Sequence, residues 1–421
     1  MTRTFETISV IGLGYVGLPT AATFASRGLR VIGVDVREET VARINAGQAH
    51  FIEPDLDIVL RAVVTANTLR AVTRPETADA YLIAVPTPIR DDHSADLSFV
   101  EAALSSIAPV LKRGDLIIIE STCPVGTTAR AARILREARA DLSFPDDAPE
   151  SADILLAYCP ERILPGQTLR ELVDNARTFG GLDRRSALAA RDLYSVFARG
   201  PQRITTAAAA ELSKLVENAF RDVNIAFANE LSVVCDAFGL DVWSVIELAN
   251  LHPRVNVLSP GPGVGGHCIP VDPWFIHEAL PDQTPLIRAA REVNDAKPGF
   301  IADRIAKVAA RFREPTVALL GLSYKPNVDD LRDSPALKIA RDLAARRIGR
   351  LLVVEPHIDG LPKDLAAEPD VAASSLDEAV AQADVVVILV AHNRFKSLNR
   401  GVLGQKVVID AVGLLAVSEI A

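Results

Sequence analysis

The sequence predicts an α/β protein with two Rossmann-like, doubly wound parallel sheets joined by a long helical connector. Short apolar, β-rich runs alternate with amphipathic helical stretches over the first third of the chain, and again after about residue 297. Strand–helix alternation of this kind is typical of a parallel sheet, whose strands are continuously apolar because helices cover both faces. Between these two regions, apolar residues recur at helical spacing instead.

The apolar runs give the expected strands. In the first region we expect strands over 8–12, 31–35, 80–85, 116–120 and 154–158, with helices over 16–27 and ending near 44. In the last region we expect strands over 316–321, 351–355, 384–391 and 406–410, with a helix over 334–345. The strings ISVIGLGYVGLP and VALLGLSYKP are similar, which favours two related halves. The alternative is that α/β sheets simply look alike at this level.

The connector is predicted to be helical from about 207 to 250, with a break near Gly239 and Asp241. A loop rich in Pro and Gly follows over 252–273, and another helix covers 285–294. We therefore divide the chain into a dinucleotide-binding domain (1–205), a helical central domain (206–298) and a second Rossmann-like domain (299–421).

Composition excludes several classes of protein. The net charge of −9 argues against a nucleic-acid or anionic-membrane partner. We expect no signal peptide, because residues 1–7 are polar and the next apolar stretch is broken by Gly12, Gly14 and Gly17. We expect no membrane span, because no run of about 18 apolar residues occurs. The four cysteines are scattered without a CxxC pair, which predicts free thiols, no metal site and a cytoplasmic location.

The GLGYVG motif at 12–17 follows a predicted strand and opens a predicted helix, as in dinucleotide-binding turns. Gly12 permits the tight turn, Gly14 lets a pyrophosphate approach the backbone, and Gly17 allows close helix–sheet packing. Asp35 ends the next strand, where its carboxylate can accept both ribose hydroxyls and repel a 2′-phosphate. The motif therefore predicts NAD, although Arg37 lies close by. The alternative for Asp35 is a helix N-cap.

Two threonines follow further strands of the first domain. Thr87 and Thr122 lie at the carboxyl ends of their predicted strands, the edge at which open α/β sheets bind ligands. Their hydroxyls are candidates for contacts to the cofactor or the substrate, and turn or cap roles are equally open.

The segment GPGVGGHCIPVDP at 261–273 is the most unusual part of the sequence. Glycines let a backbone come close to a ligand, and this run delivers Cys268 with Asp272 four residues later. A buried, structural cysteine is the alternative, and it fits Cys159 and Cys235 better. His267 is adjacent to Cys268, so in extended backbone the two side chains point apart and we do not expect a Cys–His dyad.

Polar residues also stand out on the predicted central helix and after the fifth strand. Lys214, Asn218 and Arg221 are spaced i, i+4 and i+7, so they share one helix face, which indicates a ligand-facing strip or a solvated stripe. Glu161, in CPER, sits where catalytic groups of a doubly wound domain are found, and an ordinary surface carboxylate is the alternative.

Taken together, these motifs resemble the UDP-glucose/GDP-mannose dehydrogenase family over essentially the whole chain. The resemblance rests on GLGYVGLP, VPTP, ESTCPVGTT, YCPERILPG, ELSKLVENAFRDVNIAFANELS, GPGVGGHCIPVDP and LGLSYKPNVDDLRDSP, in this order. FRDVNIAFANELS, ANLHPRVN and GPGVGGHC followed by DPWF are similar to the subgroup that acts on UDP-N-acetyl-D-mannosamine. Pro270 also occurs in enzymes that act on UDP-N-acetylglucosamine, so the sugar epimer stays open.

The resemblance implies a four-electron oxidation of a sugar primary alcohol to a carboxylate with two NAD. Cys268 would add to the intermediate aldehyde as the nucleophile, and Asp272 or Glu161 would activate the water that hydrolyses the thioester. Lys214 would steady the alkoxide or transfer protons, and Asn218 would donate to the oxyanion. Thr122 completes the predicted catalytic set.

The resemblance also implies ligand contacts and an oligomeric state. The residues that resemble the sugar-nucleotide site are Arg162, Ile163, Lys214, Asn218, Arg221, His252, Arg254, Gly265, Tyr324 and Lys325. Those that resemble the NAD contacts are Tyr15, Val16, Asp35, Thr87, Thr128 and Arg332. Without the family context, His252 and Arg254 could as well be a capping and a surface residue. The long helix resembles the family's dimerisation element, which implies a homodimer.

Two other functions compete with this one. A two-electron dehydrogenase of small hydroxy acids would use Lys214 as general acid/base and leave Cys268 structural. A non-catalytic, NAD-responsive regulator would need none of Cys268, Lys214, Asn218 and Asp272, all of which are present.

Overall fold

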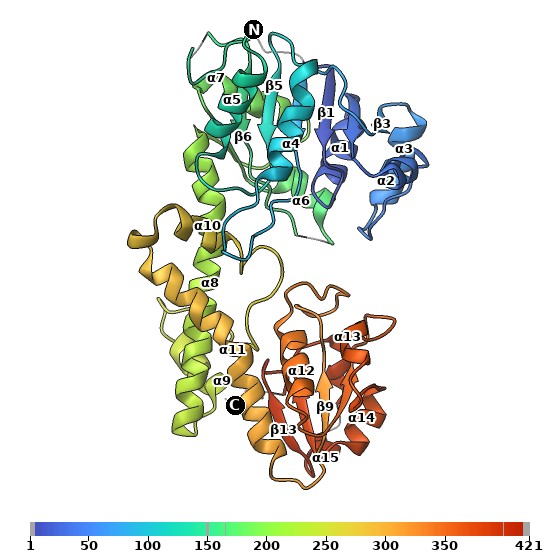
Figure 1. Cartoon of the computed structure of the whole chain (residues 1–421), viewed down its shortest axis with the longest axis vertical. Helices are drawn as coiled ribbons and strands as arrows, with labels where there is room; N and C mark the ends of the chain where they lie inside the picture. The colour runs from blue at the N-terminus through green and yellow to red at the C-terminus, as the bar shows by residue number, and fades with distance from the viewer. Residues whose placement is uncertain (1–4, 149–150, 165, 399, 416–421) are drawn as a thin grey trace. The chain divides into compact units, whose positions relative to one another are not determined.

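The structure is a computed structural model that describes residues 5–148, 151–164, 166–398 and 400–415. The chain forms two compact units, Met1–Val216 and Glu217–Ala421. Each unit contains one sheet with helices on both faces (Figure 1). Helix α8 (Ala207–Phe238) begins in the first unit and ends in the second. The α/β class with two Rossmann-like sheets and a long connecting helix is therefore confirmed, while the division into three domains stays a prediction.

The first sheet has the strand order β3-β2-β1-β4-β5-β6-β7-β8. Its strands are β1 (Thr7–Ile11), β2 (Arg30–Val34), β3 (Leu69–Val72), β4 (Ala80–Ile83), β5 (Leu116–Ile119), β6 (Leu155–Tyr158), β7 (Arg177–Gly181) and β8 (Gln202–Thr206). The first six strands in this order, from β3 to β6, run parallel to one another. Strand β7 pairs with β6 in the antiparallel direction. The strands of this edge, β7 and β8, were not predicted from the sequence, because their residues are less uniformly apolar.

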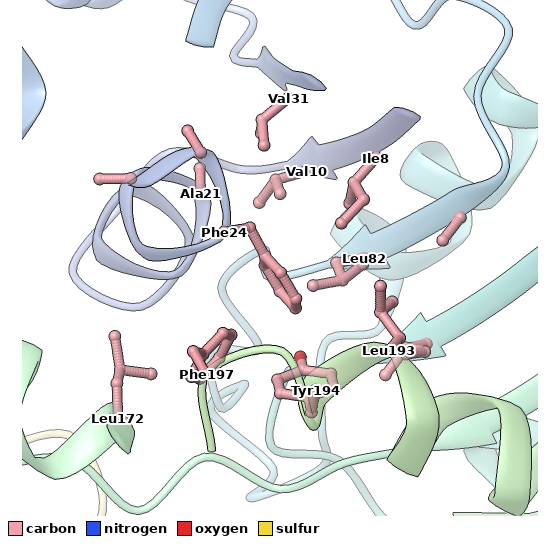
Figure 2. Packing of buried hydrophobic residues seen from close by; sticks show 14 of the residues in the cluster. Ile8, Val10, Ala21, Phe24, Val31, Leu82, Leu172, Leu193, Tyr194 and Phe197 are labelled. Carbon is pink, nitrogen blue, oxygen red and sulfur yellow. The ribbon is translucent and has the colours of Figure 1, made fainter. Parts of the chain in front are cut away.

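Helices cover both faces of the first sheet. They are α1 (Gly17–Ser26), α2 (Glu38–Asn45), α3 (Leu56–Thr65), α4 (Ser98–Ile107), η1 (Ala108–Val110), α5 (Thr127–Ala138), α6 (Thr168–Asp174) and α7 (Arg184–Tyr194). Figure 2 shows one of the two resulting cores, in which Phe24 of α1 packs edge-on against Tyr194 and Phe197. This core fixes α1, and hence the turn that precedes it, against the sheet.

The second sheet has the order β11-β10-β9-β12-β13 and is parallel throughout. Its strands are β9 (Thr316–Leu320), β10 (Arg350–Val354), β11 (Val371–Ala373), β12 (Val385–Ile388) and β13 (Val407–Asp410). Its helices are α12 (Pro335–Ala345), α13 (Lys363–Ala366), α14 (Leu376–Gln382), η3 (Asn393–Ser397) and α15 (Arg400–Leu403). Two apolar clusters, one on each face, form its core.

The central helices are α8, α9 (Val242–Asn250), α10 (Asp272–Ala279), η2 (Pro281–Gln283) and α11 (Pro285–Ala309). The predicted break occurs at residues 239–241, where Asp241 caps α9 by accepting the N–H of Ser244. The helix expected over 285–294 instead continues through Pro298 to Ala309. Ile301 and Ile305 of this extension are buried in the core of the second sheet, and this packing outweighs the cost of one lost hydrogen bond at a proline.

Candidate active site

The turn between β1 and α1 needs glycine at two positions and is open at a third. Gly12 has a φ of +91°, and a Cβ there would lie 2.6 Å from the carbonyl oxygen of Ala84. A Cβ on Gly17 would lie 1.9 Å from the carbonyl oxygen of Gly12. A Cβ on Gly14 would meet no atom within 4 Å. The turn therefore leaves open space at the one glycine that is expected to face a pyrophosphate.

The amino end of α1 is suited to an anion. Val16 precedes the helix and makes no side-chain cap, and the first turn carries no acidic residue. Exposed backbone N–H groups and the helix dipole then favour a phosphate. Tyr15 beside it is half-exposed and stacks on Phe51 at 4.3 Å between ring centroids. Sequence reasoning missed Phe51, because nothing in its neighbourhood marks it as close to the turn.

Asp35 ends β2 next to this turn and is almost fully buried. Oδ2 accepts the N–H of Leu13 at 3.3 Å, and Oδ1 accepts the N–H of Arg37 at 3.0 Å. The N-cap of α2 is Arg37, so the alternative reading of Asp35 as the cap of that helix is not what the structure has. The Arg37 side chain is largely exposed and lies 3.3 Å from Asp35 Oδ1.

The threonines of the first unit differ from one another. The hydroxyl of Thr87 is shielded from solvent and has no hydrogen-bond partner among the described residues, as expected of a group that awaits a ligand. Thr122 is half-buried beyond the end of β5. Thr128 is fully buried, and its hydroxyl and N–H both donate to Glu211 of α8, at 2.6 and 2.8 Å. A direct contact of the Thr128 hydroxyl with NAD would require that bond to break.

These features fit an NAD molecule: a glycine turn with open space, an uncapped helix terminus, a carboxylate at the second strand end, and the buried hydroxyl of Thr87. The residues that would hold it are Gly12, Gly14, Tyr15, Val16, Gly17, Asp35 and Thr87.

Glu161 is a buried member of an ionic cluster, not a surface carboxylate. Its Oε2 accepts from Arg177 at 2.9 Å and its Oε1 from the N–H of Arg162 at 2.7 Å. Arg177 in turn lies over the ring of Tyr194, whose hydroxyl donates to Glu120. Burial, reinforced by the like charge of Glu161, raises the pKa of Glu120 to about 8. Arg162 is half-buried beside this cluster, and Ile163 packs on the apolar core.

Cys268 is the one cysteine of the chain that is not buried. Its carbonyl oxygen accepts the N–H of Asp272 at 2.9 Å, which closes the turn that starts α10. Gly265 and Gly266 precede it, and Cβ atoms there would lie 2.9 Å from side-chain atoms of Tyr324. These glycines therefore allow close approach to the protein's own Tyr324. The expectation from sequence was approach to a ligand.

The polar residues of α8 differ in how deeply they are buried. Asn218 is buried and its Nδ2 donates to Oδ2 of Asp272 at 2.5 Å. Lys214 is half-buried with no side-chain hydrogen bond or ion pair among the described residues, and Arg221 is exposed. Asn218 and Asp272, which are 54 residues apart, are thus brought together beside the turn that carries Cys268.

The remaining predicted substrate residues lie in the second unit. Tyr324 and Lys325 line a cavity of about 230 Å³ together with Pro262 and Gly263 of the glycine-rich segment. The ammonium of Lys325 lies 5.6 Å from the Tyr324 ring centroid. Arg332, predicted to reach NAD, is exposed and pairs with Asp330 at 2.6 Å.

His252 and Arg254 are exposed in the loop after α9. They contact each other within this loop, where the N–H of Arg254 donates to Nδ1 of His252 at 3.3 Å.

Comparison with known proteins decides the family. Profiles of the UDP-glucose/GDP-mannose dehydrogenase family match in three parts: its NAD binding domain at 6–198, its central domain at 208–296 and its UDP binding domain at 318–416. The chain belongs to the UDP-glucose/GDP-mannose dehydrogenase family. It is an NAD-dependent dehydrogenase, and the predicted cofactor is confirmed.

Several relatives match over nearly their full length. The chain is 54% identical to an NDP-N-acetyl-D-galactosaminuronic acid dehydrogenase of Ralstonia solanacearum, covering 99% of this chain and 98% of the relative. It is 53% identical to the UDP-N-acetyl-D-mannosamine dehydrogenase of Escherichia coli K12, covering 97% and 99%. Among solved structures, the UDP-N-acetyl-mannosamine dehydrogenase of Staphylococcus aureus superposes with a TM-score of 0.85 at 38% identity, covering 98% and 96%.

Within the described residues, none of the helices has the length and apolar character that crossing a membrane would require.

Proposed function

We propose that this dehydrogenase oxidises UDP-N-acetyl-D-mannosamine to UDP-N-acetyl-D-mannosaminuronate in two hydride transfers, with Cys268 as a covalent nucleophile. The observation that carries the proposal is the placement of Cys268. Cys268 is partly exposed whereas the other three cysteines are buried, and it lies on the turn that Asn218 and Asp272 hold.

Cys268 explains how one site can oxidise the same carbon twice. NAD, when bound, accepts a hydride, and removal of the first hydride from the C6 alcohol leaves an aldehyde. The Cys268 thiolate adds to that carbonyl carbon, which forms an S–C bond and a tetrahedral thiohemiacetal with a hydrogen to lose. Loss of the second hydride gives a thioester, and water then cleaves the S–C bond. The balance is RCH₂OH + 2 NAD⁺ + H₂O → RCOO⁻ + 2 NADH + 3 H⁺.

The surrounding residues would handle charge and protons. The second N–H of the Asn218 amide, beyond the one that Asp272 holds, would donate to the oxyanion. Lys214, whose ammonium has no partner among the described side chains, would steady the substrate alkoxide.

Asp272 is the better candidate for the base that activates water. It lies at the start of α10, four residues from Cys268. Glu161 has both oxygens engaged, by Arg177 and by the N–H of Arg162. We assign hydrolysis to Asp272 and give Glu161 the role of holding the segment that carries Arg162 and Ile163.

The nucleotide part of the substrate would occupy the second unit. The chain's UDP binding domain spans 318–416, and the cavity lined by Tyr324 and Lys325 offers an aromatic ring and a cation. The other contacts that we propose are Gly265, Arg221, His252 and Arg254, by their match to the family's motifs. A small hydroxy acid would have no use for this domain, which disfavours the two-electron alternative.

The choice of sugar rests on the family motifs and on the relatives. Relatives at 53% identity act on UDP-N-acetyl-D-mannosamine by name, whereas the Ralstonia relative at 54% carries the name of a galactosaminuronic acid enzyme. A UDP-N-acetylgalactosamine substrate is therefore a second candidate, alongside the UDP-N-acetylglucosamine suggested by Pro270. The uronate product would serve the synthesis of a surface polysaccharide.

We also propose that the chain forms a homodimer through α8. Six large apolar residues of this helix are exposed: Leu212, Val216, Phe220, Phe227, Val234 and Phe238. At about 100° per residue they form a stripe roughly 80° wide along the helix. Exposed apolar stripes of this length mark protein interfaces. A cytoplasmic location fits four cysteines that form no disulfide among the described residues.

The test is a product count. The enzyme is incubated with NAD and, separately, with UDP-linked N-acetylmannosamine, N-acetylgalactosamine, N-acetylglucosamine and glucose, and NADH is measured against acid formed. We expect two NADH per acid, with the highest kcat/KM for UDP-N-acetylmannosamine. One NADH per product, with aldehyde accumulating, would reject the four-electron reaction. A preference for another sugar would reject only the epimer.

A further inference from the structure

The segment that carries Cys268 is held at both ends by one helix. At its C-terminal end, Asn218 of α8 binds Asp272. At its N-terminal end, the backbone N–H of Gly261 donates to Oδ1 of Asn229, also of α8, at 2.9 Å. The two asparagines are three helical turns apart, so they lie within about 20° of each other around the helix axis. They face away from the exposed apolar stripe defined above.

Asn229 is fixed by a chain of buried hydrogen bonds into α11. Its Nδ2 donates to Oδ1 of Asn294 at 2.8 Å, and Nδ2 of Asn294 donates to Oδ1 of Asp222 at 2.8 Å. Arg291 donates to the same oxygen of Asp222 at 2.5 Å. All four side chains are at most 1% exposed. The chain ends at the backbone of the partly exposed Gly261, and Arg291 also pairs with Asp295 at the surface.

This chain also fixes which way the Asn229 amide points. Because its Nδ2 is required by Asn294, its Oδ1 is left facing Gly261, whose N–H can only donate. Buried ionic and polar chains contribute little net stability compared with apolar packing of the same volume. A conformational role therefore accounts for this chain better than a contribution to stability.

The glycine-rich segment at 261–272, which the two asparagines hold at its ends, needs such anchors. Gly263 and Gly266 have φ values of +143° and +86°, in the region that only glycine adopts without strain. Glycine also loses the most conformational freedom when it is ordered. Without Gly261 held in place, the segment before Cys268 would sample several backbone conformations.

We propose that Asn229 is a positioning residue for Cys268: by holding Gly261, it fixes the N-terminal end of the segment that presents the thiol. Its side-chain amide is engaged by Asn294 and by the N–H of Gly261, so its role is to position the segment. The proposal rests on the proposed function in so far as Cys268 is the nucleophile. A displacement of about 1 Å can cost on the order of a hundredfold in rate, so an anchor seven residues away can matter to catalysis.

The test compares Asn229→Ala, Asn229→Asp and Asn294→Ala with the wild-type enzyme. Asn229→Ala removes the acceptor of the Gly261 N–H. Asn229→Asp keeps an acceptor oxygen, and Asn294→Ala keeps the Gly261 bond but frees the amide to rotate. Asn224→Ala is the matched control, since Asn224 lies on the same helix and, among the described residues, its side chain binds the carbonyl of Phe220.

We expect Asn229→Ala to lower kcat about ten- to a hundredfold with an unchanged KM for NAD. The other two variants should lie between it and the wild type, and Asn224→Ala should match the wild type. The second readout is alkylation by iodoacetamide, which reports on Cys268 because the other cysteines are buried. We expect the alkylation rate to rise severalfold in Asn229→Ala.

A variant that melts at a lower temperature but keeps wild-type kcat and alkylation rate would overturn the proposal, because Asn229 would then be merely structural. Equal losses in Asn229→Asp and Asn229→Ala would overturn it as well. If Asn229→Ala does not fold, the test uses Asn229→Asp and Asn294→Ala instead. Wild-type kcat and alkylation rate in both of these variants would reject the proposal. The alkylation readout does not require Cys268 to be the nucleophile. Failure of the proposed function, seen as acid formation by Cys268→Ala, is therefore a separate result.

Discussion

The two sheets of this protein begin with the same turn and use it differently. In the first, Gly12 has a φ of +91° and its N–H donates to the carbonyl of Val34 at 2.8 Å. In the second, Gly321 has a φ of +97° and its N–H donates to the carbonyl of Val354, also at 2.8 Å. The expected similarity of the two halves therefore extends to the backbone.

In both sheets the next residue donates its N–H to an acid that follows the second strand. Leu13 donates to Asp35 at 3.3 Å, and Leu322 donates to Glu355 at 2.7 Å. The difference lies beyond this bond. Oε2 of Glu355 also lies 3.1 Å from Nε2 of the fully buried His392. The acid of the second sheet is covered by a side chain of its own domain.

The tautomer of His392 follows from its partners. Nδ1 accepts the N–H of Asn327 at 2.9 Å, so the proton sits on Nε2 and is donated to Glu355. Burial by itself would raise the pKa of Glu355, but the bonds from His392 and from the backbone N–H of Leu322 outweigh it and hold the pKa below its ordinary value. The position of Gly14 is taken by Ser323, which is buried. We infer that the turn alone does not make a dinucleotide site, which also needs open space and an acid with spare acceptor capacity.

The largest expected effect is at Cys268, where a substitution should stop acid formation but leave NAD binding intact. Cys268→Ala should lower acid formation by more than about a thousandfold, because no covalent intermediate can form. NAD affinity, measured by fluorescence titration, should stay within about twofold of the wild-type value. Cys235→Ala, at a buried cysteine, is the control and should retain kcat. Acid formation at the wild-type rate by Cys268→Ala would rule out the thiol mechanism.

Next in size is the contrast between two glycines of the first turn. Gly17→Ala would place a methyl group 1.9 Å from the carbonyl oxygen of Gly12, so we expect loss of NAD binding and a melting temperature lowered by several degrees. Gly14→Ala meets no protein atom, so it should keep the wild-type melting temperature and weaken only NAD. If Gly14→Ala bound NAD as tightly as the wild type, the pyrophosphate would not lie over this residue.

A third prediction concerns Glu120, an acid of the first sheet that faces inward. Its pKa of about 8 in the folded protein lies above the 4.5 of an exposed Glu, so the folded state holds the extra proton between these values. Stability should therefore fall as pH rises from about 5 to 8, by at most a few kcal/mol. Glu120→Gln should remove this part of the pH dependence, as measured by urea unfolding at pH 5, 6.5 and 8. Parallel curves for the two proteins would contradict the raised pKa.

The smallest expected effect concerns Arg37. Its side chain is 62% exposed, and its ion pair with Asp35 is of a kind that contributes about 1 kcal/mol at most. Arg37→Ala should therefore change NAD affinity by less than about fivefold. A larger loss would mean that Arg37 itself contacts the cofactor.

Much of the fold could be predicted from sequence because its signals are local. The apolar runs of β4 and β5 are continuous, and the break at 239–241 has its own turn residues. Strands β7 and β8 were missed because they form a less apolar, antiparallel edge. The extension of α11 beyond Pro298 was missed because long-range packing overrides a local signal.

The sequence predicts site residues where one residue type implies one chemistry, as for the glycine turn, Asp35 and Cys268, and their roles stay predictions. Pairings over long separations, such as Glu211 with Thr128, Arg177 with Glu161 and Asn229 with Gly261, leave no periodic trace in the sequence. They arise from the fold, and Glu161 is more enclosed than its position after a strand suggested.

The most direct test of the comparison is an NAD titration of two matched variants, Asp35→Asn and Glu355→Gln, by isothermal calorimetry. Each exchanges a carboxylate for an amide of the same shape. We predict one NAD per chain in the wild type, an affinity reduced by about tenfold or more in Asp35→Asn, and an unchanged affinity in Glu355→Gln. Equal losses in both variants, or two NAD per chain, would contradict the claim that only the first sheet binds the dinucleotide.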